Sequence, residues 1–180
     1  IGNGIRQSIV NQQKQFIEEF FPTIQLVMAG NDTEGLRYGT IGTPEKFFLR
    51  WKEDEEDSSQ LQLDKYLAKI CNKKRLLEII HDFVLFDGGI KKLPRYHQYF
   101  GIKAAQEHVR RREGGIIWHT QGSGKSIVMV MLAKWILENN PNARVAILTD
   151  RTELDKQIER VFNDAGEPLI RTSSGRELME

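Results

Sequence analysis

Apolar residues recur along this chain of 180 residues at spacings that predict both helices and strands. In Arg6–Phe21 they recur at three- and four-residue intervals, which predicts a helix that ends before Pro22. Thr23–Ala29 is a largely apolar run followed by turn-forming residues, and this pattern predicts a strand. Arg37–Ile41 and Lys46–Trp51 predict two further strands. We therefore expect mixed helix and sheet in the N-terminal part.

Residues 52–60 interrupt this pattern with an acidic, serine-containing stretch that has no apolar side chain to bury. Such a stretch is typical of a solvated linker, and a cluster of metal-binding carboxylates is the alternative. Beyond it, apolar spacing predicts two short helices within Leu61–Asp82 and a longer helix at Tyr96–Arg112. We predict a domain boundary at 52–60, between domains at 1–51 and 61–180.

The C-terminal part alternates strand and helix patterns. Strands are predicted at Gly115–Trp118 and Val145–Thr149, and helices at Lys125–Glu138 and Glu153–Phe162. Strands that alternate with helices favour a parallel sheet with crossover helices. The predicted fold class is therefore α/β.

Composition excludes several classes of protein. Lys and Arg total 26 against 25 Asp and Glu, so any DNA contact is expected from local patches rather than from an overall positive charge. A single cysteine, Cys71, excludes an intramolecular disulfide framework and is typical of a reducing compartment, so a cytoplasmic location is expected. The longest apolar runs fall well short of the ~20 residues that span a bilayer, and we expect no membrane segment.

The segment His119–Ser126 has the sequence of a phosphate-binding loop, between an apolar strand pattern and an amphipathic helix pattern. Its glycines would let backbone N–H groups converge on a phosphate, while Lys125 would neutralise β- and γ-oxygens. The Ser126 hydroxyl would bind Mg²⁺. A plain turn between strand and helix is the alternative, and His119 stands where the usual pattern has glycine. The expected ATP-binding residues of the loop are Thr120, Gly122, Ser123, Gly124, Lys125 and Ser126.

Two neighbouring segments resemble motifs of superfamily 2 helicases. Gln98 lies a little over twenty residues before the loop, where those helicases carry the glutamine that hydrogen-bonds adenine. An amide offers a donor and an acceptor side by side, but a glutamine on a helix is otherwise an ordinary surface residue. The segment with Thr149, Arg151 and Gln157 is similar to the helicase motif that contacts DNA. Its alternative is a plain helix N-terminus capped by Thr152.

Nearly the whole chain resembles the restriction subunit of type I restriction-modification enzymes. The resemblance is carried by Ala29–Thr40, Phe86–Lys92, Arg95–Phe100, Ile117–Ser126 and Thr149–Arg151. It implies that 1–51 is the C-terminal remnant of a restriction-endonuclease-like domain. It also implies that 61–180 is the first part of a RecA-like motor domain with a parallel sheet, which uses ATP and Mg²⁺.

The same resemblance implies an enzyme that couples ATP-dependent translocation on double-stranded DNA to cleavage of unmodified DNA. Its partners would be the methylation and specificity subunits of the same complex. Gln7 would be a support residue of the nuclease, although Asn11 stands where the family has tyrosine and no Glu-x-Lys precedes Gln7. The phosphate-binding loop predicts that the chain binds ATP. Because the nuclease motif is incomplete, we expect the chain to be inactive alone.

Two other functions stay open on the sequence. The phosphate loop could belong to another P-loop enzyme, such as a small nucleotide kinase that uses Asp150 as its acid. The chain could also be a module that binds ATP without catalysis. Product analysis would separate the kinase from a translocating ATPase.

Overall fold

The computed structural model describes residues 1–53, 61–150, 152–172 and 175–176. The chain divides into two compact units, one of residues 1–85 and 90–117 and one of residues 86–89 and 118–180. The predicted domains 1–51, 52–60 and 61–180 follow a different division and stay predictions. In the described part, no helix is long and apolar enough to cross a membrane.

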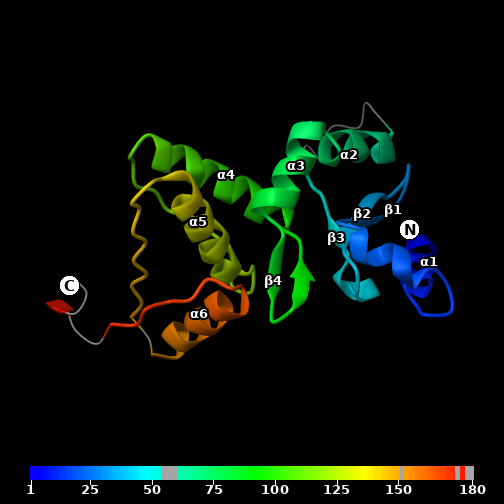
Figure 1. Ribbon diagram of the computed structural model, residues 1–180. Helices are drawn as coiled ribbons and strands as arrows, with labels where there is room; N and C mark the ends of the chain where they lie inside the picture. Colours follow the sequence, from blue (N-terminus) through cyan, green and yellow to red (C-terminus); the bar gives the residue numbers. More distant parts are fainter. Residues whose placement is uncertain (54–60, 151, 173–174, 177–180) are drawn as a thin grey trace. The chain divides into compact units, whose positions relative to one another are not determined.

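The first unit contains a three-stranded antiparallel sheet of β1 (Val27–Asn31), β2 (Gly35–Gly39) and β3 (Leu49–Arg50) (Figure 1). β1 pairs with β2 from Val27 opposite Gly39 to Asn31 opposite Gly35. α1 (Gly2–Asn11) packs against β1, and the 3-10 helices are η1 (Glu18–Thr23) and η2 (Glu45–Phe47). The core of this part contains Ile5, Phe21, Val27 and Phe48.

The predicted helix Arg6–Phe21 is wrong over its second half, because α1 ends at Asn11. The side chain of Gln12 donates to the Ser8 carbonyl at 3.2 Å, which satisfies a carbonyl near the end of α1. The residues that follow α1 are polar, and the apolar pair Phe16 and Ile17 stays about half exposed at 51% and 52%. Without a buried face, this segment gains little from continuing the helix.

The rest of the first unit is mainly helical. α2 (Gln62–Ile70) packs against β2 and is followed by α3 (Lys73–Asp82). Asn72 caps α3, since its side-chain oxygen accepts from the backbone N–H groups of Lys74 at 3.2 Å and Arg75 at 3.4 Å. The two short helices expected in Leu61–Asp82 are confirmed. α4 (Tyr96–Arg110) confirms the longer predicted helix, after a hairpin of β4 (Leu85–Asp87) and β5 (Ile90–Lys92).

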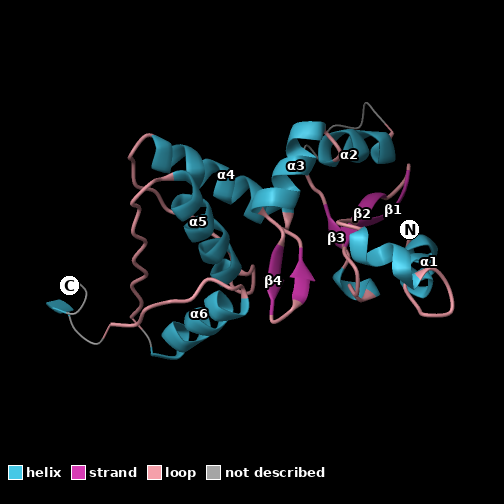
Figure 2. Ribbon diagram, in the orientation of Figure 1, coloured by secondary structure: helices cyan, strands magenta, loops and turns pink. Residues whose placement is uncertain are grey.

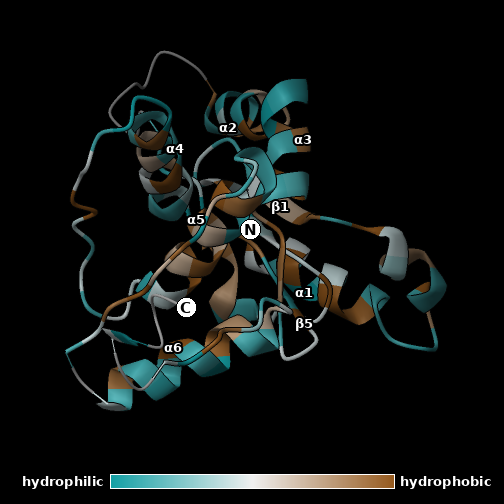
Figure 3. Cartoon of the chain, turned by 60° about the vertical axis from the view of Figure 1, so that its left-hand side comes forward, coloured by the Kyte–Doolittle hydropathy of each residue, from teal (hydrophilic) through white to brown (hydrophobic). Residues whose placement is uncertain are grey.

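The second unit contains α5 (Lys125–Asn139) and α6 (Thr152–Asp164), which pack against each other. Both confirm predicted helices. Figure 3 shows hydrophobic patches along the largely hydrophilic α6, on which Ile158 and Phe162 are buried. Amphipathic spacing therefore explains how α6 packs.

The strands predicted at Gly115–Trp118 and Val145–Thr149 are wrong for this structure, where both segments are irregular (Figure 2). Ile116 and Trp118 are each 89% exposed, and Leu148 is 88% exposed. The described residues form only the three-stranded antiparallel sheet and the hairpin, so neither segment has a partner strand there. A strand of a parallel sheet needs hydrogen-bonded neighbours and helices on both faces, which explains why apolar pattern alone did not form one.

Candidate functional site

The loop before α5 contains two glycines in the left-handed region of backbone conformation. Gly122 has a φ of +76° and Gly124 a φ of +81°, both in the left-handed region that glycine adopts without a steric cost. The Ser123 N–H donates to the Thr120 carbonyl at 3.3 Å, which closes a turn between them. The backbone therefore makes a tight turn directly before the N-terminus of α5.

The N-terminus of α5 offers backbone donors. Gly124 is its N-cap residue, and no side chain in the described structure caps the helix by a hydrogen bond. The first intrahelical bond runs from the Val128 N–H to the Gly124 carbonyl at 3.2 Å. The N–H groups of the first turn therefore lack the partners that a polar N-cap side chain would give. Together with the helix dipole, such groups favour an anion.

Lys125 brings a positive charge to the same loop. Its side chain is exposed, and its ammonium donates to the carbonyl of Thr120 at 2.9 Å and to that of His119 at 3.3 Å. The side chain therefore folds back over the loop that precedes it. A phosphate oxygen accepts a stronger, charge-assisted hydrogen bond than a neutral carbonyl does. Exchange of these carbonyls for phosphate oxygens is thus the change that nucleotide binding would require of Lys125.

The three hydroxyl groups of the loop differ in exposure. Thr120 is exposed, Ser126 is half-buried in the first turn of α5, and Ser123 is only 5% exposed. The described residues contain no group of three His, Cys, Asp or Glu side chains that could hold a metal ion. Mg²⁺ takes oxygen ligands and keeps several waters, so the Ser126 hydroxyl with phosphates and water is a donor set that fits this ion.

Gln98 is buried rather than a surface residue, at 4% exposure in the first turn of α4. Its side-chain Oε1 accepts from the backbone N–H of Arg95 at 2.8 Å. This bond caps the helix and fixes the orientation of the amide group. Gln98 belongs to the first compact unit and the phosphate loop to the second.

The residues expected to contact DNA lie around the start of α6. Thr149 is half-buried and Gln157 is exposed on α6, while Arg151 lies outside the described residues. Asp155 in the first turn forms an ion pair with Arg171, and Glu159 lies 3.7 Å from the same guanidinium. Glu153 and Asp155 in the first turn interact favourably with the helix dipole, so the alternative of a plain helix N-terminus also fits this segment. Its role in DNA binding stays a prediction.

The candidate nuclease support residue Gln7 is exposed on α1. Its Nε2 donates to the Asn11 side chain at 2.9 Å, one turn further along the helix. The two residues that the family comparison of the sequence singled out therefore contact each other. An exposed pair of this kind stabilises a helix only slightly, and the contact leaves the support role a prediction.

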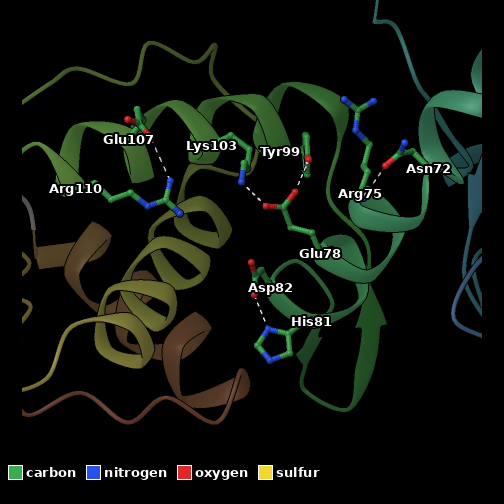
Figure 4. A network of polar contacts seen from close by, with 9 residues as sticks. All are labelled: Asn72, Arg75, Glu78, His81, Asp82, Tyr99, Lys103, Glu107 and Arg110. Atoms are coloured by element: carbon green, nitrogen blue, oxygen red, sulfur yellow. Dashed lines mark hydrogen bonds and ion pairs between the residues drawn. The ribbon is translucent and has the colours of Figure 1, made fainter.

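A polar network between α3 and α4 has no sequence motif and was not expected. Glu78 accepts from the Tyr99 hydroxyl at 2.6 Å and from the Lys103 ammonium (Figure 4). Burial alone would raise the pKa of Glu78, but the hydrogen bonds from Lys103 and Tyr99 outweigh it and lower the pKa below its ordinary value. Burial and the bond to Glu78 raise the pKa of Tyr99 to about 12.

Glu53 forms another ion pair in this unit, with Arg75. The Arg75 guanidinium donates to Glu53 Oε2 at 2.5 Å and to Oε1 at 3.3 Å, and the indole N–H of Trp51 donates to Oε2 at 2.8 Å. The expectation that 52–60 is a solvated linker is therefore wrong at Glu53, while 54–60 lies outside the described residues. Arg75 lies 22 positions from Glu53, so the local sequence could not reveal this ion pair.

Comparison with known proteins covers the segment that contains the loop. The SWI2/SNF2 ATPase family matches residues 97–180, which include the whole phosphate loop. The part of the chain that contains the loop is therefore similar to this ATPase family. Over 155 residues the chain is 34% identical to the type I restriction enzyme HindI endonuclease subunit of Haemophilus influenzae, covering 75% of this chain and 15% of that protein. The chain thus resembles a part of a type I restriction enzyme endonuclease subunit.

More distant relatives carry the same kind of name. A Methanocaldococcus jannaschii protein, provisionally named the type I restriction enzyme MjaIXP endonuclease subunit, is 28% identical over 198 residues, 91% of this chain and 19% of its own length. The type I restriction enzyme SauCOLORF180P endonuclease subunit of Staphylococcus aureus is 24% identical over 156 residues, 84% of this chain and 17% of its own length. The chain thus spans less than a fifth of the length of these relatives.

Proposed function

We propose that this chain binds ATP with Mg²⁺ as part of the motor of a type I restriction enzyme. The observation that carries the proposal is the loop before α5, where two left-handed glycines, a helix N-terminus without a side-chain cap among the described residues and the Lys125 ammonium converge. The phosphates would bind the N–H groups and Lys125, and Ser126 would bind Mg²⁺. Thr120, Gly122, Ser123 and Gly124 would form the cradle.

The proposal extends to the longer protein. In it, ATP hydrolysis would drive movement along double-stranded DNA, and a nuclease domain would cut unmodified DNA. The methylation and specificity subunits would be its partners, and the location would be cytoplasmic. Residues 1–51 would close the nuclease domain, and 61–180 would begin a RecA-like domain with a parallel sheet. Thr149, Arg151 and Gln157 would contact DNA, and Gln7 would support the nuclease.

Calorimetry with Mg²⁺-ATP tests the phosphate site. We expect weak binding by the chain, which Lys125→Ala should reduce roughly ten- to hundredfold, because a charged partner of the phosphates is lost. Lys134→Ala is the matched control, since Lys134 lies on the same helix and forms a long ion pair of 3.9 Å with Glu138. Equal affinity of wild type and Lys125→Ala would contradict the phosphate site.

Gln98 distinguishes the helicase-like proposal from a generic phosphate loop. If its amide binds adenine, Gln98→Ala should weaken ATP binding roughly ten- to hundredfold and leave GTP binding nearly unchanged. Gln98→Glu sharpens the test, because a carboxylate keeps an acceptor for the Arg95 N–H but loses the amide donor. A change in the ratio of ATP to GTP affinity in both variants would support adenine recognition. An unchanged ratio in both would contradict it.

The chain alone should neither hydrolyse ATP measurably nor nick plasmid DNA. We expect this because no two acidic residues are adjacent after Lys125 in this sequence and no Glu-x-Lys stands before Gln7. Phosphate release and plasmid nicking with Mg²⁺ measure the two activities. Turnover that co-purifies with the homogeneous chain, and that Lys125→Ala abolishes, would place the catalytic acids within these residues. Formation of a phosphorylated small acceptor would favour the kinase alternative.

A further inference from the structure

One buried hydrogen bond joins the N-terminal sheet to the start of α4. Tyr38 lies on β2 and is 2% exposed, and its hydroxyl donates to the Pro94 carbonyl at 2.7 Å. The two residues are 56 positions apart in the sequence, and both belong to the first compact unit. Pro94 is itself fully buried and immediately precedes Arg95, the N-cap residue of α4. A strand in the predicted nuclease remnant therefore contacts the backbone that begins the helix bearing Gln98.

The peptide group between Pro94 and Arg95 makes hydrogen bonds from both sides. Its carbonyl oxygen accepts from Tyr38, and its N–H donates to Gln98 Oε1 at 2.8 Å. A peptide group is planar, so fixing the direction of its C=O also fixes the direction of its N–H. Hydrogen bonds in series through one polarisable group also strengthen each other. The orientation of the Gln98 amide thus depends on the Tyr38 hydroxyl.

Aromatic packing holds the other side of Gln98. The Trp51 ring lies 6.1 Å from the Tyr38 ring, 5.5 Å from that of Tyr99 and 5.7 Å from that of Phe100, measured between centroids. Tyr99 and Phe100 directly follow Gln98 in α4. Ring pairs at these separations and tilted angles are favourable and depend on orientation. The backbone is therefore held both before and after Gln98 by residues from the first 51 positions.

We propose that Tyr38 is a positioning residue that orients the Gln98 amide for adenine and so contributes to nucleotide selectivity. The proposal rests on the adenine-binding role of Gln98 proposed above. Tyr38 acts through the Pro94–Arg95 peptide and has no contact with nucleotide in this mechanism. Burial raises the pKa of the Tyr38 phenol, more than the nearby Arg95 charge lowers it, so the hydroxyl stays a donor at neutral pH.

Tyr38→Phe tests the proposal, because it removes the donor and keeps the ring beside Trp51. We expect the ratio of ATP to GTP affinity to fall about three- to tenfold, as for loss of one hydrogen bond. By NMR, the Arg95 amide should exchange with solvent about three- to tenfold faster, because its partner is the Gln98 side chain. The Tyr99 amide, which donates to the Arg95 carbonyl at 3.0 Å, reports the helix itself and should change less.

Thr40→Val is the matched control. The Thr40 hydroxyl is also in the sheet region, in a residue 2% exposed, and donates to the Gln25 carbonyl at 3.1 Å. Its loss should leave both the nucleotide ratio and the Arg95 exchange rate unchanged. Equal acceleration of the Arg95 and Tyr99 amides in Tyr38→Phe would indicate a purely structural role and overturn the proposal. So would an effect of Thr40→Val as large as that of Tyr38→Phe.

If Gln98 does not bind adenine, the experiments should give a different set of results. In that case Gln98→Glu would leave the ratio of ATP to GTP affinity unchanged, which overturns the selectivity part of the proposal together with that role. Selective exchange of the Arg95 amide in Tyr38→Phe would then still support the orientation of Gln98 by Tyr38. If Gln98→Glu changes the ratio but Tyr38→Phe changes neither the ratio nor the exchange, Tyr38 is not a positioning residue.

Discussion

Trp51 and Trp118 are the same residue in opposite surroundings. Trp51 is 0% exposed, packs beside the rings of Tyr99 and Phe100 and lies under the Arg75 guanidinium at 5.6 Å from the ring centroid. Trp118 is 89% exposed in a segment that the hydrophobic pattern predicted to be a buried strand. Local sequence therefore did not decide whether an apolar side chain was buried. The surroundings differ, because the rings of Tyr99 and Phe100 pack against Trp51, whereas 115–118 pairs with no strand in the described structure.

Strand connectivity explains much of this difference. β1 and β2 are antiparallel and pair across a short turn, so each strand finds its partner close in the sequence. A parallel strand needs a partner that is reached by a crossover of a dozen or more residues. The predicted strands at 115–118 and 145–149 lie on either side of such a crossover, α5, and do not pair with each other in the described structure. Sequence neighbours in a parallel arrangement need not be neighbours in the sheet.

The largest expected effect is that of Trp51→Ala. Trp51→Ala removes a fully buried indole, its packing against neighbouring rings and its hydrogen bond to Glu53. The free energy of unfolding should therefore fall by about 3–5 kcal/mol. Urea denaturation followed by circular dichroism measures this change. A loss below about 1 kcal/mol would mean that the aromatic cluster around Trp51 contributes little and that the comparison with Trp118 is misplaced.

Glu78→Gln tests the polar network between α3 and α4, in which Glu78 accepts hydrogen bonds from Tyr99 and Lys103. The pKa of Glu78 is lowered below its ordinary value of 4.5 in the fold, so folding favours the ionised form. Its stabilisation is therefore complete above pH 4.5 and is lost as the pH falls through the lowered value. We expect Glu78→Gln to cost about 1–2 kcal/mol at pH 7 and progressively less below pH 4.5. Urea denaturation over a pH series measures both.

Glu107→Gln is the control for this pH series. Glu107 forms an exposed ion pair with Arg110 on the same helix at 3.2 Å (Figure 4). Such a pair is worth at most about 0.5 kcal/mol, so the variant should follow the wild-type pH profile closely. A parallel loss in both variants at every pH would contradict the special role of the bonds from Tyr99 and Lys103.

The sequence predicted local features of the fold well. Helices α4, α5 and α6 were placed nearly to their ends, because amphipathic spacing and helix-starting residues are local signals. The extension of α1 to Phe21 failed because periodic spacing does not tell which apolar residues are buried. The Tyr38–Pro94 and Arg75–Glu53 contacts join residues 56 and 22 positions apart, which no periodicity reveals.

The candidate site divides in the same way. The phosphate loop could be predicted because its chemistry lies in eight consecutive residues, 119–126. The carbonyls of His119 and Thr120 as acceptors for Lys125 could not, since backbone atoms carry no residue signature. The helix-capping bond of Gln98 was also missed, although its position three residues after Arg95 is the spacing at which a glutamine side chain reaches the N-cap residue.

Gly122→Ala is expected to have a smaller effect on stability than Trp51→Ala or Glu78→Gln. An added Cβ would meet nothing within 4 Å, so space is not the constraint. The constraint is the backbone, because a φ of +76° should cost about 1 kcal/mol of stability in a residue that has a side chain. Gly114→Ala is the control, because it also has open space and no left-handed φ. ATP affinity by calorimetry should fall in Gly122→Ala and not in Gly114→Ala.

Trp118→Ala should have the smallest effect, and it tests the comparison from the other side. At 89% exposure the indole removes little surface from water, so the free energy of unfolding should change by less than about 0.5 kcal/mol. Urea denaturation under the conditions used for Trp51→Ala gives the direct comparison. Leu148→Ser, at 88% exposure, should be equally neutral for the same reason. A loss in Trp118→Ala that approaches that of Trp51→Ala would mean that 115–118 is buried in solution. An apolar side chain stabilises a fold through the surface that folding removes from water, so a large loss means a buried indole. The hydrophobic pattern would then have predicted the burial of this segment correctly.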